Sequence, residues 1–137
     1  KRMRPKMRLW MTVREQKDVK INIINGAGRD GLADIVGDNF ANRDFQVLER
    51  VDDSEESVEG VGRLRFGPAG VGSAHLVRAY FLDLVELDYE LDREGDVVDV
   101  IVGAGFQQLA TPTEFNQSIA QLGRPQLPEN TCAGEEG

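Results

Sequence analysis

Apolar and polar residues alternate without a break over residues 85–92, which read V-E-L-D-Y-E-L-D. Side chains two apart on a strand share a face, so this period of two predicts a strand with one apolar and one acidic face. Residues 97–102 are also mostly apolar, and they follow a turn signal, R-E-G-D, at residues 93–96. The two segments are therefore predicted to pair as a hairpin, with Asp99 beside the acidic face of the first strand.

The same kind of pattern predicts three more strands and two helices. Strands are expected at residues 19–24, 45–51 and 63–66, and an acidic loop at residues 52–61 separates the second of these from the third. Apolar residues three or four apart mark two helices, whose core-facing sets are Leu32, Ile35, Val36 and Phe40 in residues 31–42, and Ala74, Val77, Tyr80, Phe81 and Leu84 in residues 73–84. Asp30 is expected to cap the first helix.

The two halves of this pattern resemble each other when the sequence is shifted by 41 residues. Gly26 then falls on Gly67 and Phe40 falls on Phe81, and each half runs strand, glycine-rich turn, helix, strand. We therefore predict an α/β fold, a single sandwich of about five strands in one sheet with two helices on one face, built from two strand–helix–strand repeats. Phe40 and Phe81 are expected to be buried between the helices and the sheet.

The predicted fold occupies residues 19–109. Residues 1–18 form a basic arm, and residues 110–137 read as a polar tail in which only residues 113–122 have helical character. No apolar run approaches the length needed to span a membrane. The chain begins with Lys1 rather than Met, and we expect an anchor or a signal segment upstream of it.

Composition narrows the possible classes of protein. A chain of 137 residues, 40% of them apolar, is long enough for a folded core, and its net charge of −8 argues against duplex DNA as a partner. Cys132 is the only cysteine, which excludes an intramolecular disulfide and a cysteine zinc site, so it is expected to be a free thiol.

His75 is the only histidine and is expected on the exposed face of its helix. No nucleophile motif accompanies it, so no catalytic residue and no enzyme is predicted.

Charged residues are distributed unevenly along the chain. The carboxylates on the predicted strand face are Glu86, Asp88, Glu90 and Asp92, and the arm contributes Arg4, Lys6, Arg8 and Trp10. The acidic set is either a solvated sheet face or a docking face for a basic partner. Its side chains lie about 7 Å apart, too far to hold one cation tightly, so no metal site is predicted. The arm is either a disordered leader, an added strand, or a ligand for the acidic face, in cis or from a neighbouring copy.

Residues 26–31 read G-A-G-R-D-G between the first predicted strand and the first helix. The pattern matches the G-x-G-x-x-G loop that lets a backbone approach a phosphate at a helix N-terminus. The candidates for such an anion site are the three glycines Gly26, Gly28 and Gly31. Glu49 or Asp52 lies near the position of the acid that binds a ribose. The alternative is a structural turn, which also needs glycine, and the chain has too few strands for a full dinucleotide fold, so no cofactor is predicted.

Three stretches carry a resemblance to a known family. They are INIINGAGRDGLADIVGDNFANRDFQV (residues 21–47), RLRFGPAGVGSAHLV (residues 63–77) and VVDVIVGAGFQQL (residues 97–109). In this order they are similar to the strand–NG-x-G–helix opening, the strand–Y/F-G-P–helix segment and the closing strand of the LytR C-terminal domain family. Ala27 departs from the small hydroxyl residue of many members, and Gly105 departs from their common Asp.

The resemblance implies an α/β domain of the bacterial cell envelope, outside the cytoplasmic membrane, that often accompanies LytR–CpsA–Psr proteins. No catalytic residues are established for the domain, so none is carried over to this chain. We therefore predict a non-catalytic envelope domain that binds cell-wall polymer or a partner envelope protein. Two alternatives stay open: a nucleotide-binding protein that uses residues 26–31, and a structural subunit of a larger assembly held by its N-terminal arm and C-terminal tail.

Overall fold

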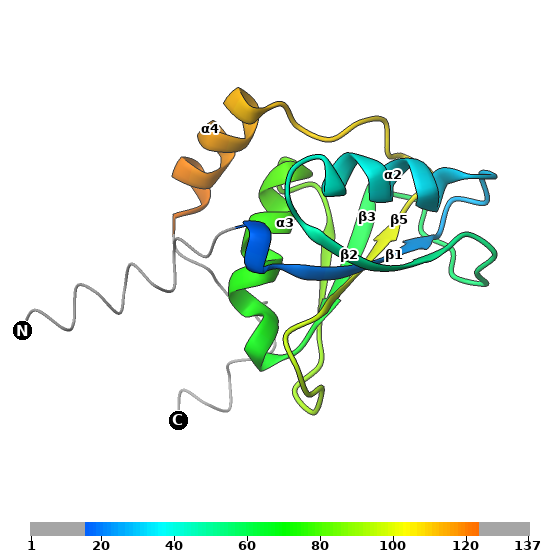
Figure 1. Ribbon diagram of the computed structural model, residues 1–137, viewed down its shortest axis with the longest axis horizontal. Coiled ribbons are helices and arrows are strands. Elements are labelled where there is room, and N and C mark those ends of the chain that lie inside the picture. The colour runs from blue at the N-terminus through cyan, green and yellow to red at the C-terminus, as the bar shows by residue number, and fades with distance from the viewer. Residues whose placement is uncertain (1–15, 124–137) are drawn as a thin grey trace, which may run out of the picture.

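Five strands form one mixed sheet in the computed structural model, which describes residues 16–123 (Figure 1). The strands are β1 (Lys20–Asn25), β2 (Gln46–Val51), β3 (Gly62–Phe66), β4 (Glu86–Tyr89) and β5 (Val98–Val102). Their order in the sheet is β2-β1-β5-β3-β4, so the last strand in the sequence lies at the centre. β1 is parallel to β2 and to β5, whereas β3 is antiparallel to β5 and parallel to β4.

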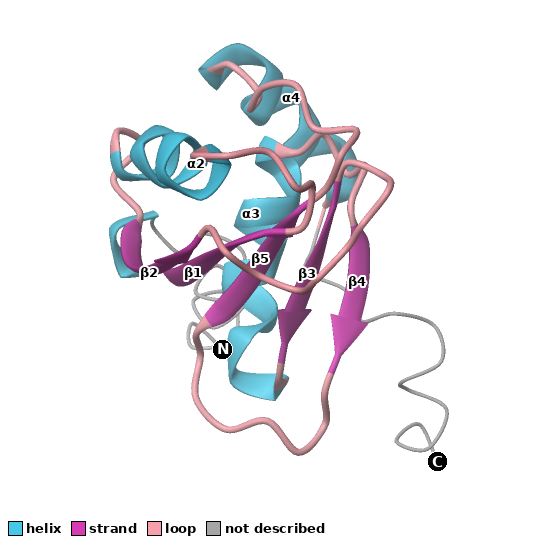
Figure 2. Ribbon diagram, turned by 90° about the vertical axis from the view of Figure 1, so that its right-hand side faces the viewer, coloured by secondary structure: helices cyan, strands magenta, loops and turns pink. Residues whose placement is uncertain are grey.

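Two helices connect the parallel strand pairs and lie against the sheet (Figure 2). α2 (Leu32–Ala41) joins β1 to β2, and α3 (Val71–Tyr80) joins β3 to β4. Parallel crossovers are right-handed, and with these strand directions that rule puts both helices on the same face. The short 3-10 helices η1 (Gln16–Asp18) and η2 (Pro68–Gly70) precede β1 and α3. The predicted α/β class, with one five-stranded sheet, is confirmed.

A further helix, α4 (Pro112–Leu122), follows β5 and packs on α3, where the sequence predicted helical character in residues 113–122. Thr111 and Glu114 form a capping box at its N-terminus, and Pro112 occupies the first turn. The ring of Phe115 stacks on Tyr80 with 4.1 Å between the ring centroids. α4 therefore covers the side of α3 that faces away from the sheet.

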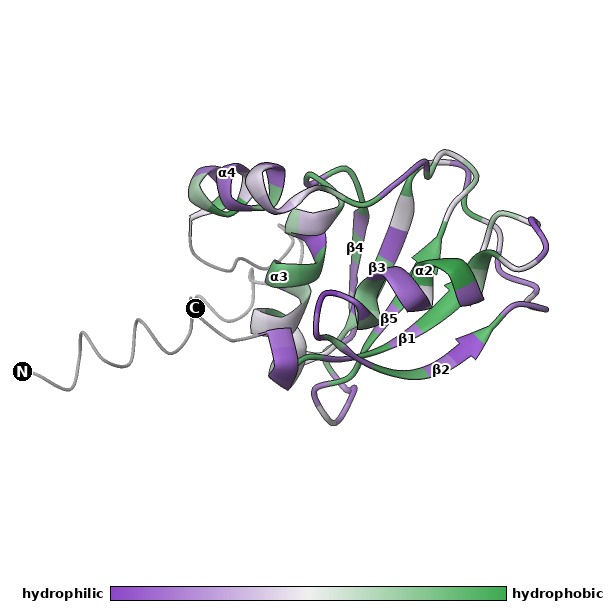
Figure 3. Ribbon diagram, turned by 45° about the horizontal axis from the view of Figure 1, so that its top comes forward, coloured by the Kyte–Doolittle hydropathy of each residue, from purple (hydrophilic) through white to green (hydrophobic). Residues whose placement is uncertain are grey.

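The core lies between the sheet and the helices. Along the three central strands alternate side chains point toward the helices and are buried, namely Ile21 and Ile23, Val98, Val100 and Val102, and Leu64 and Phe66. In Figure 3 the hydrophobic colour concentrates on β1 and β5. The predicted burial of Phe40 and Phe81 is confirmed, and their ring centroids lie 5.9 Å apart.

Each half of the fold is a strand, a helix and a parallel strand, but the turns of the two halves differ. Gly28 and Gly31 adopt left-handed φ values of 69° and 80° before α2, whereas a 3-10 turn over Pro68–Gly70 precedes α3. The 41-residue repeat therefore remains a prediction from the sequence.

The predicted hairpin is wrong, because β3 lies between β4 and β5. Arg63 and Arg65 of β3 are directly opposite Glu86 and Asp88 of β4, and Arg65 is also opposite Asp99 of β5. A direct pair of β4 and β5 would have placed carboxylates opposite carboxylates, which is unfavourable. The intervening arginines remove that repulsion.

Two predicted core residues, Ile35 and Leu84, are exposed, as is Leu91 of the predicted strand, and one predicted cap is wrong. Ile35 is 57% exposed on the outer face of α2. Leu84 is 63% exposed because α3 ends before it, at Tyr80. Leu91 is 68% exposed because β4 ends before it, at Tyr89. The N-cap of α2 is Gly31, with no cap from Asp30.

Candidate functional site

The glycine-rich loop between β1 and α2 packs directly on the sheet. A Cβ atom at Gly26 would lie 2.7 Å from Ile101 Cγ2 and 3.0 Å from the carbonyl oxygen of Val102. The Gly26 N–H already donates a hydrogen bond to that oxygen at 2.8 Å. By contrast, a Cβ at Gly28 or Gly31 would meet nothing within 4 Å, so these two positions favour glycine for their left-handed backbone. The close packing at Gly26 and the left-handed backbone at Gly28 and Gly31 are both requirements of a structural turn.

The Asp52 carboxylate closes the N-terminus of α2, the place where a phosphate would bind. Its two oxygens accept hydrogen bonds from the N–H groups of Gly31 (2.8 Å) and Ala33 (3.2 Å), and Asn25 Nδ2 lies 3.2 Å from one of them. These bonds hold the pKa of Asp52 below its ordinary value. The sequence places Asp52 at the distance from the glycine loop that is expected of a ribose-binding acid. In the structure its carboxylate instead occupies the anion position at the start of α2. This geometry favours the structural turn over an anion site at Gly26.

Replacing Asp52 by asparagine is expected to lower the melting temperature at neutral pH and to have little effect in acid. A carboxylate with a lowered folded-state pKa stabilises the fold above its unfolded pKa of about 3.9, and that contribution disappears as the pH falls through the folded pKa. The melting temperatures of the two proteins should therefore converge below about pH 3.9. Asp53→Asn, at the exposed neighbouring position, is the matched control. A gap that persists unchanged to pH 2 would contradict a role for the charge.

The predicted acidic face lies on the side of the sheet away from α2 and α3, where the carboxylates have arginine partners. Arg63 pairs with Glu86 at 3.0 Å, Arg65 with Asp88 at 3.3 Å and Glu56 at 3.4 Å, and Arg93 with Glu90 at 3.2 Å and Asp99 at 3.1 Å. Asp92 is exposed in the turn after β4 and is not part of this strand face. The arm residues Arg4, Lys6, Arg8 and Trp10 lie outside the described residues.

His75 is only 3% exposed, so the prediction of an exposed helix residue is wrong. The outer side of α3 is covered, and Ser118 of α4 is buried there as well. Within residues 16–123, neither imidazole nitrogen makes a hydrogen bond of standard length and angle. Burial, assisted by the charge of Arg78, lowers the pKa of His75 and keeps the ring neutral.

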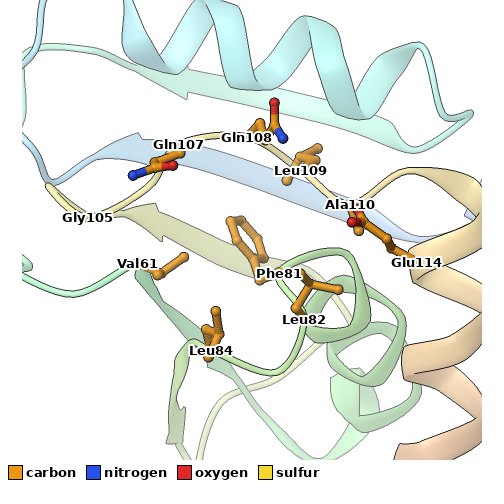
Figure 4. Close-up of a pocket in the computed structure, with 10 residues that line it drawn as sticks. All are labelled: Val61, Phe81, Leu82, Leu84, Gly105, Gln107, Gln108, Leu109, Ala110 and Glu114. Carbon is orange, nitrogen blue, oxygen red and sulfur yellow. The ribbon is translucent and has the colours of Figure 1, made fainter.

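A surface groove of about 350 Å³ lies at one end of the sheet (Figure 4). It is lined by Val61, Phe81, Leu82, Leu84, Gly105, Gln107, Gln108, Leu109, Ala110 and Glu114. These residues come from the position just before β3, the turn after α3 and the segment that leads from β5 to α4. Leu82 and Leu84 are 42% and 63% exposed, so the groove offers apolar side chains to a ligand.

The turn that forms one wall of the groove has a strained backbone. Leu82 and Asp83 take successive left-handed φ values of 54° and 62°, which non-glycine residues rarely adopt. Hydrogen bonds from the Leu82 and Asp83 N–H groups to the carbonyls of Ala79 and Arg78, and an ion pair of Arg78 with Asp83, hold this conformation. Strain of this kind costs about 1–3 kcal/mol per residue and is concentrated at functional sites. Here it turns two leucines toward solvent.

Polar groups on the opposite wall suit a ligand with amide or hydroxyl groups. Gln107 and Gln108 are exposed, and their side chains make no hydrogen bond within residues 16–123. Glu114 is engaged, because its Oε1 accepts the Thr111 N–H at 3.0 Å. The groove therefore combines free hydrogen-bonding amides with apolar walls, which is the chemistry of a binding site.

Within residues 16–123, no three His, Cys, Asp or Glu residues are grouped so that they could hold a metal ion. None of the helices in that range has the length and apolar character to cross a membrane.

The groove could not be predicted from the sequence because its residues come from three separate segments. The available signal was the pair of leucines that flanks Asp83 just past the end of α3.

Comparisons with known proteins agree with the fold. The model of the family described as LytR cell envelope-related transcriptional attenuator matches residues 18–106. A crystal structure of the soluble domain of a conserved hypothetical secreted protein from Mycobacterium marinum is similar, with a TM-score of 0.69 and 25% sequence identity over 95% of this chain and 90% of that one. No protein with a curated description matches the chain.

Proposed function

Because the chain belongs to the LytR C-terminal domain family, an extracytoplasmic family of non-catalytic cell-envelope domains, we propose that it binds an extended segment of a partner envelope protein in its groove. The observation that carries this proposal is the pair of exposed leucines, Leu82 and Leu84, opposite the free amides of Gln107 and Gln108. Apolar side chains of a peptide fit the first wall, and its backbone amides pair with the second.

Electrostatics favours a protein partner over a cell-wall polymer. Residues 16–123 contain 20 Asp and Glu against 9 Lys and Arg, which gives a net charge of −11. A polymer that carries phosphates or carboxylates is repelled by this surface, whereas a neutral or basic peptide is not. The polymer is therefore the second candidate, and its supporting feature is the pair of glutamine amides, which also suit sugar hydroxyls.

Replacing Leu84 by aspartate is expected to weaken peptide binding about 10- to 100-fold, because burial of a leucine side chain contributes about 1.5–3 kcal/mol. The ligand is selected by panning a random peptide library displayed on phage against the full chain, and its affinity is measured by titration calorimetry. Ile35→Asp is the matched control, since Ile35 is 57% exposed but lies outside the groove lining. Equal losses in both variants would exclude the groove.

A second arm of the experiment tests the polymer. The full chain is sedimented with purified peptidoglycan sacculi, with and without Leu84→Asp. Sedimentation that depends on Leu84, together with a failure to select any groove-dependent peptide, would replace the protein partner by the polymer. A chain that binds neither would contradict the groove as a binding site.

A further inference from the structure

The outer edge of β4 is open within the described residues. β4 ends the strand order, and no strand in residues 16–123 lies beyond it (Figure 2). The Glu90 N–H donates to the carbonyl oxygen of Phe66 on β3 at 2.8 Å. Backbone groups of successive residues point to opposite sides of a strand, so the N–H and C=O groups of Leu87 and Tyr89 point away from the sheet. Such an edge is a template for another strand.

Side chains make this edge acidic on the sheet face away from the helices. Glu86, Asp88 and Glu90 have side chains that are 64%, 42% and 43% exposed. Their partners Arg63 and Arg65 are less exposed, at 33% and 21%, because they lie on β3. Five carboxylates in this network share three guanidinium groups. The edge repels β4 of a second copy and attracts a cationic strand.

The other face of the edge is apolar. Leu87 and Tyr89 point toward the helix layer, are half-buried and pack against the core. A strand added at this edge thus meets carboxylates on one face and apolar side chains on the other. Its complementary sequence carries apolar residues at every second position and includes basic residues between them.

The chain contains such a segment in residues 6–14, K-M-R-L-W-M-T-V-R. Met7, Leu9, Met11 and Val13 alternate with Arg8, Trp10, Thr12 and Arg14. We propose that residues 7–13 of a second copy add as a strand to the outer edge of β4. This interaction is separate from the groove and goes beyond the proposed function.

Chain geometry places the segment in a second copy rather than in the same one. Gln46 of β2 donates from its N–H to the Val19 carbonyl and from Nε2 to the Lys17 carbonyl at 2.7 Å, so the arm enters the fold beside β2. β2 and β4 are the opposite edges of the sheet, separated by four strand spacings, roughly 19 Å. Val13 is four residues from Lys17, which gives a reach of at most about 14 Å. A strand of residues 7–13 therefore cannot lie along β4 of its own copy.

Sedimentation of the full chain tests the proposal. We expect self-association in about 50 mM salt and a monomer in about 1 M salt, where the Debye length shrinks to about 3 Å. The double substitution Leu9→Pro with Met11→Pro, which blocks strand pairing of the arm, should give a monomer in both. A chain that is monomeric in low salt, or a double variant that still associates, would overturn the proposal.

Two further readouts separate strand addition from loose charge attraction. A synthetic peptide of residues 6–14 should dissociate the assembly, and N-methylation at one alternate set of its residues should abolish that effect while methylation at the other set should not. Amide hydrogen exchange at Leu87 and Tyr89 should slow at least tenfold in the assembly, because those N–H groups become hydrogen-bonded. Equal potency of both methylated peptides, or unchanged exchange at both amides, would contradict pairing at this edge.

Discussion

Replacing Phe40 by alanine is expected to lower the free energy of unfolding by about 3–5 kcal/mol, the usual cost of removing a buried aromatic ring. Phe40 has no exposed surface, and its ring packs on Phe45, Phe81 and Tyr80 with centroid distances of 5.0, 5.9 and 6.4 Å. Removing the ring opens a cavity where α2, α3 and the sheet meet. Urea unfolding followed by circular dichroism measures the loss.

The matched control for this substitution is Ile35→Ala on the same helix. Ile35 is 57% exposed, so its truncation removes little buried surface and introduces a good helix former. The control should change the free energy of unfolding by less than about 0.5 kcal/mol. If both variants lost similar stability, the predicted role of the aromatic cluster would be wrong.

Replacing Gly103 by alanine should destabilise the fold by about 1–3 kcal/mol or more, the range for overpacked positions. A Cβ atom there would lie 2.1 Å from the carbonyl oxygen of Gly60 and 2.9 Å from Val58 Cγ1. Backbone hydrogen bonds from Gly103, Ala104 and Gly105 hold this loop on the end of β5. The added methyl group must break that contact, because it meets backbone atoms.

Thermal unfolding of Gly103→Ala and Gly60→Ala provides the comparison. A Cβ at Gly60 would meet nothing within 4 Å, and its φ is not left-handed, so alanine should be tolerated there. A melting temperature of Gly103→Ala equal to that of the wild type would show that the loop over residues 58–61 moves without cost.

The local pattern located the strands and helices to within a few residues, but it did not show which strands pair. The alternation around residues 85–92 gave a strand because side-chain direction has a period of two within any strand. The partner of that strand depends on which residues meet across the sheet, and the arginines of β3, some 23 positions earlier, decided it. Sequence proximity to residues 97–102 was misleading for that reason.

The environment of His75 illustrates a second limit of sequence reasoning. The apolar spacing in residues 73–84 indicates one buried stripe on a helix, and His75 lies off that stripe. α4, which begins only at Pro112, packs on α3 and contributes to the burial of its outer side. A polar helix so distant in the chain carries no local signal that it will bury another helix.

The candidate site was only partly accessible from the sequence. Asp52 was placed at the right distance from Gly31, but its role as an internal cap depends on where β2 ends relative to α2. The groove depends on the backbone conformation of Leu82 and Asp83, which a helical pattern continued through Leu84 does not reveal. Tertiary contacts therefore decided both features.

The central position of β5 has a consequence for the order in which the chain folds. Val98 pairs with Ile21, a residue 77 positions earlier, and β5 is the strand that joins β2-β1 to β3-β4. Before β5 is present, the chain has two separate β–α–β units, and the inner edge strand of each, β1 or β3, lacks the partner that β5 provides. We expect the polypeptide to stay unfolded until residue 102 is available, and contacts of such long range make the final step slow. When the chain is synthesised from its N-terminus, the complete sheet can therefore form only after β5 has been made.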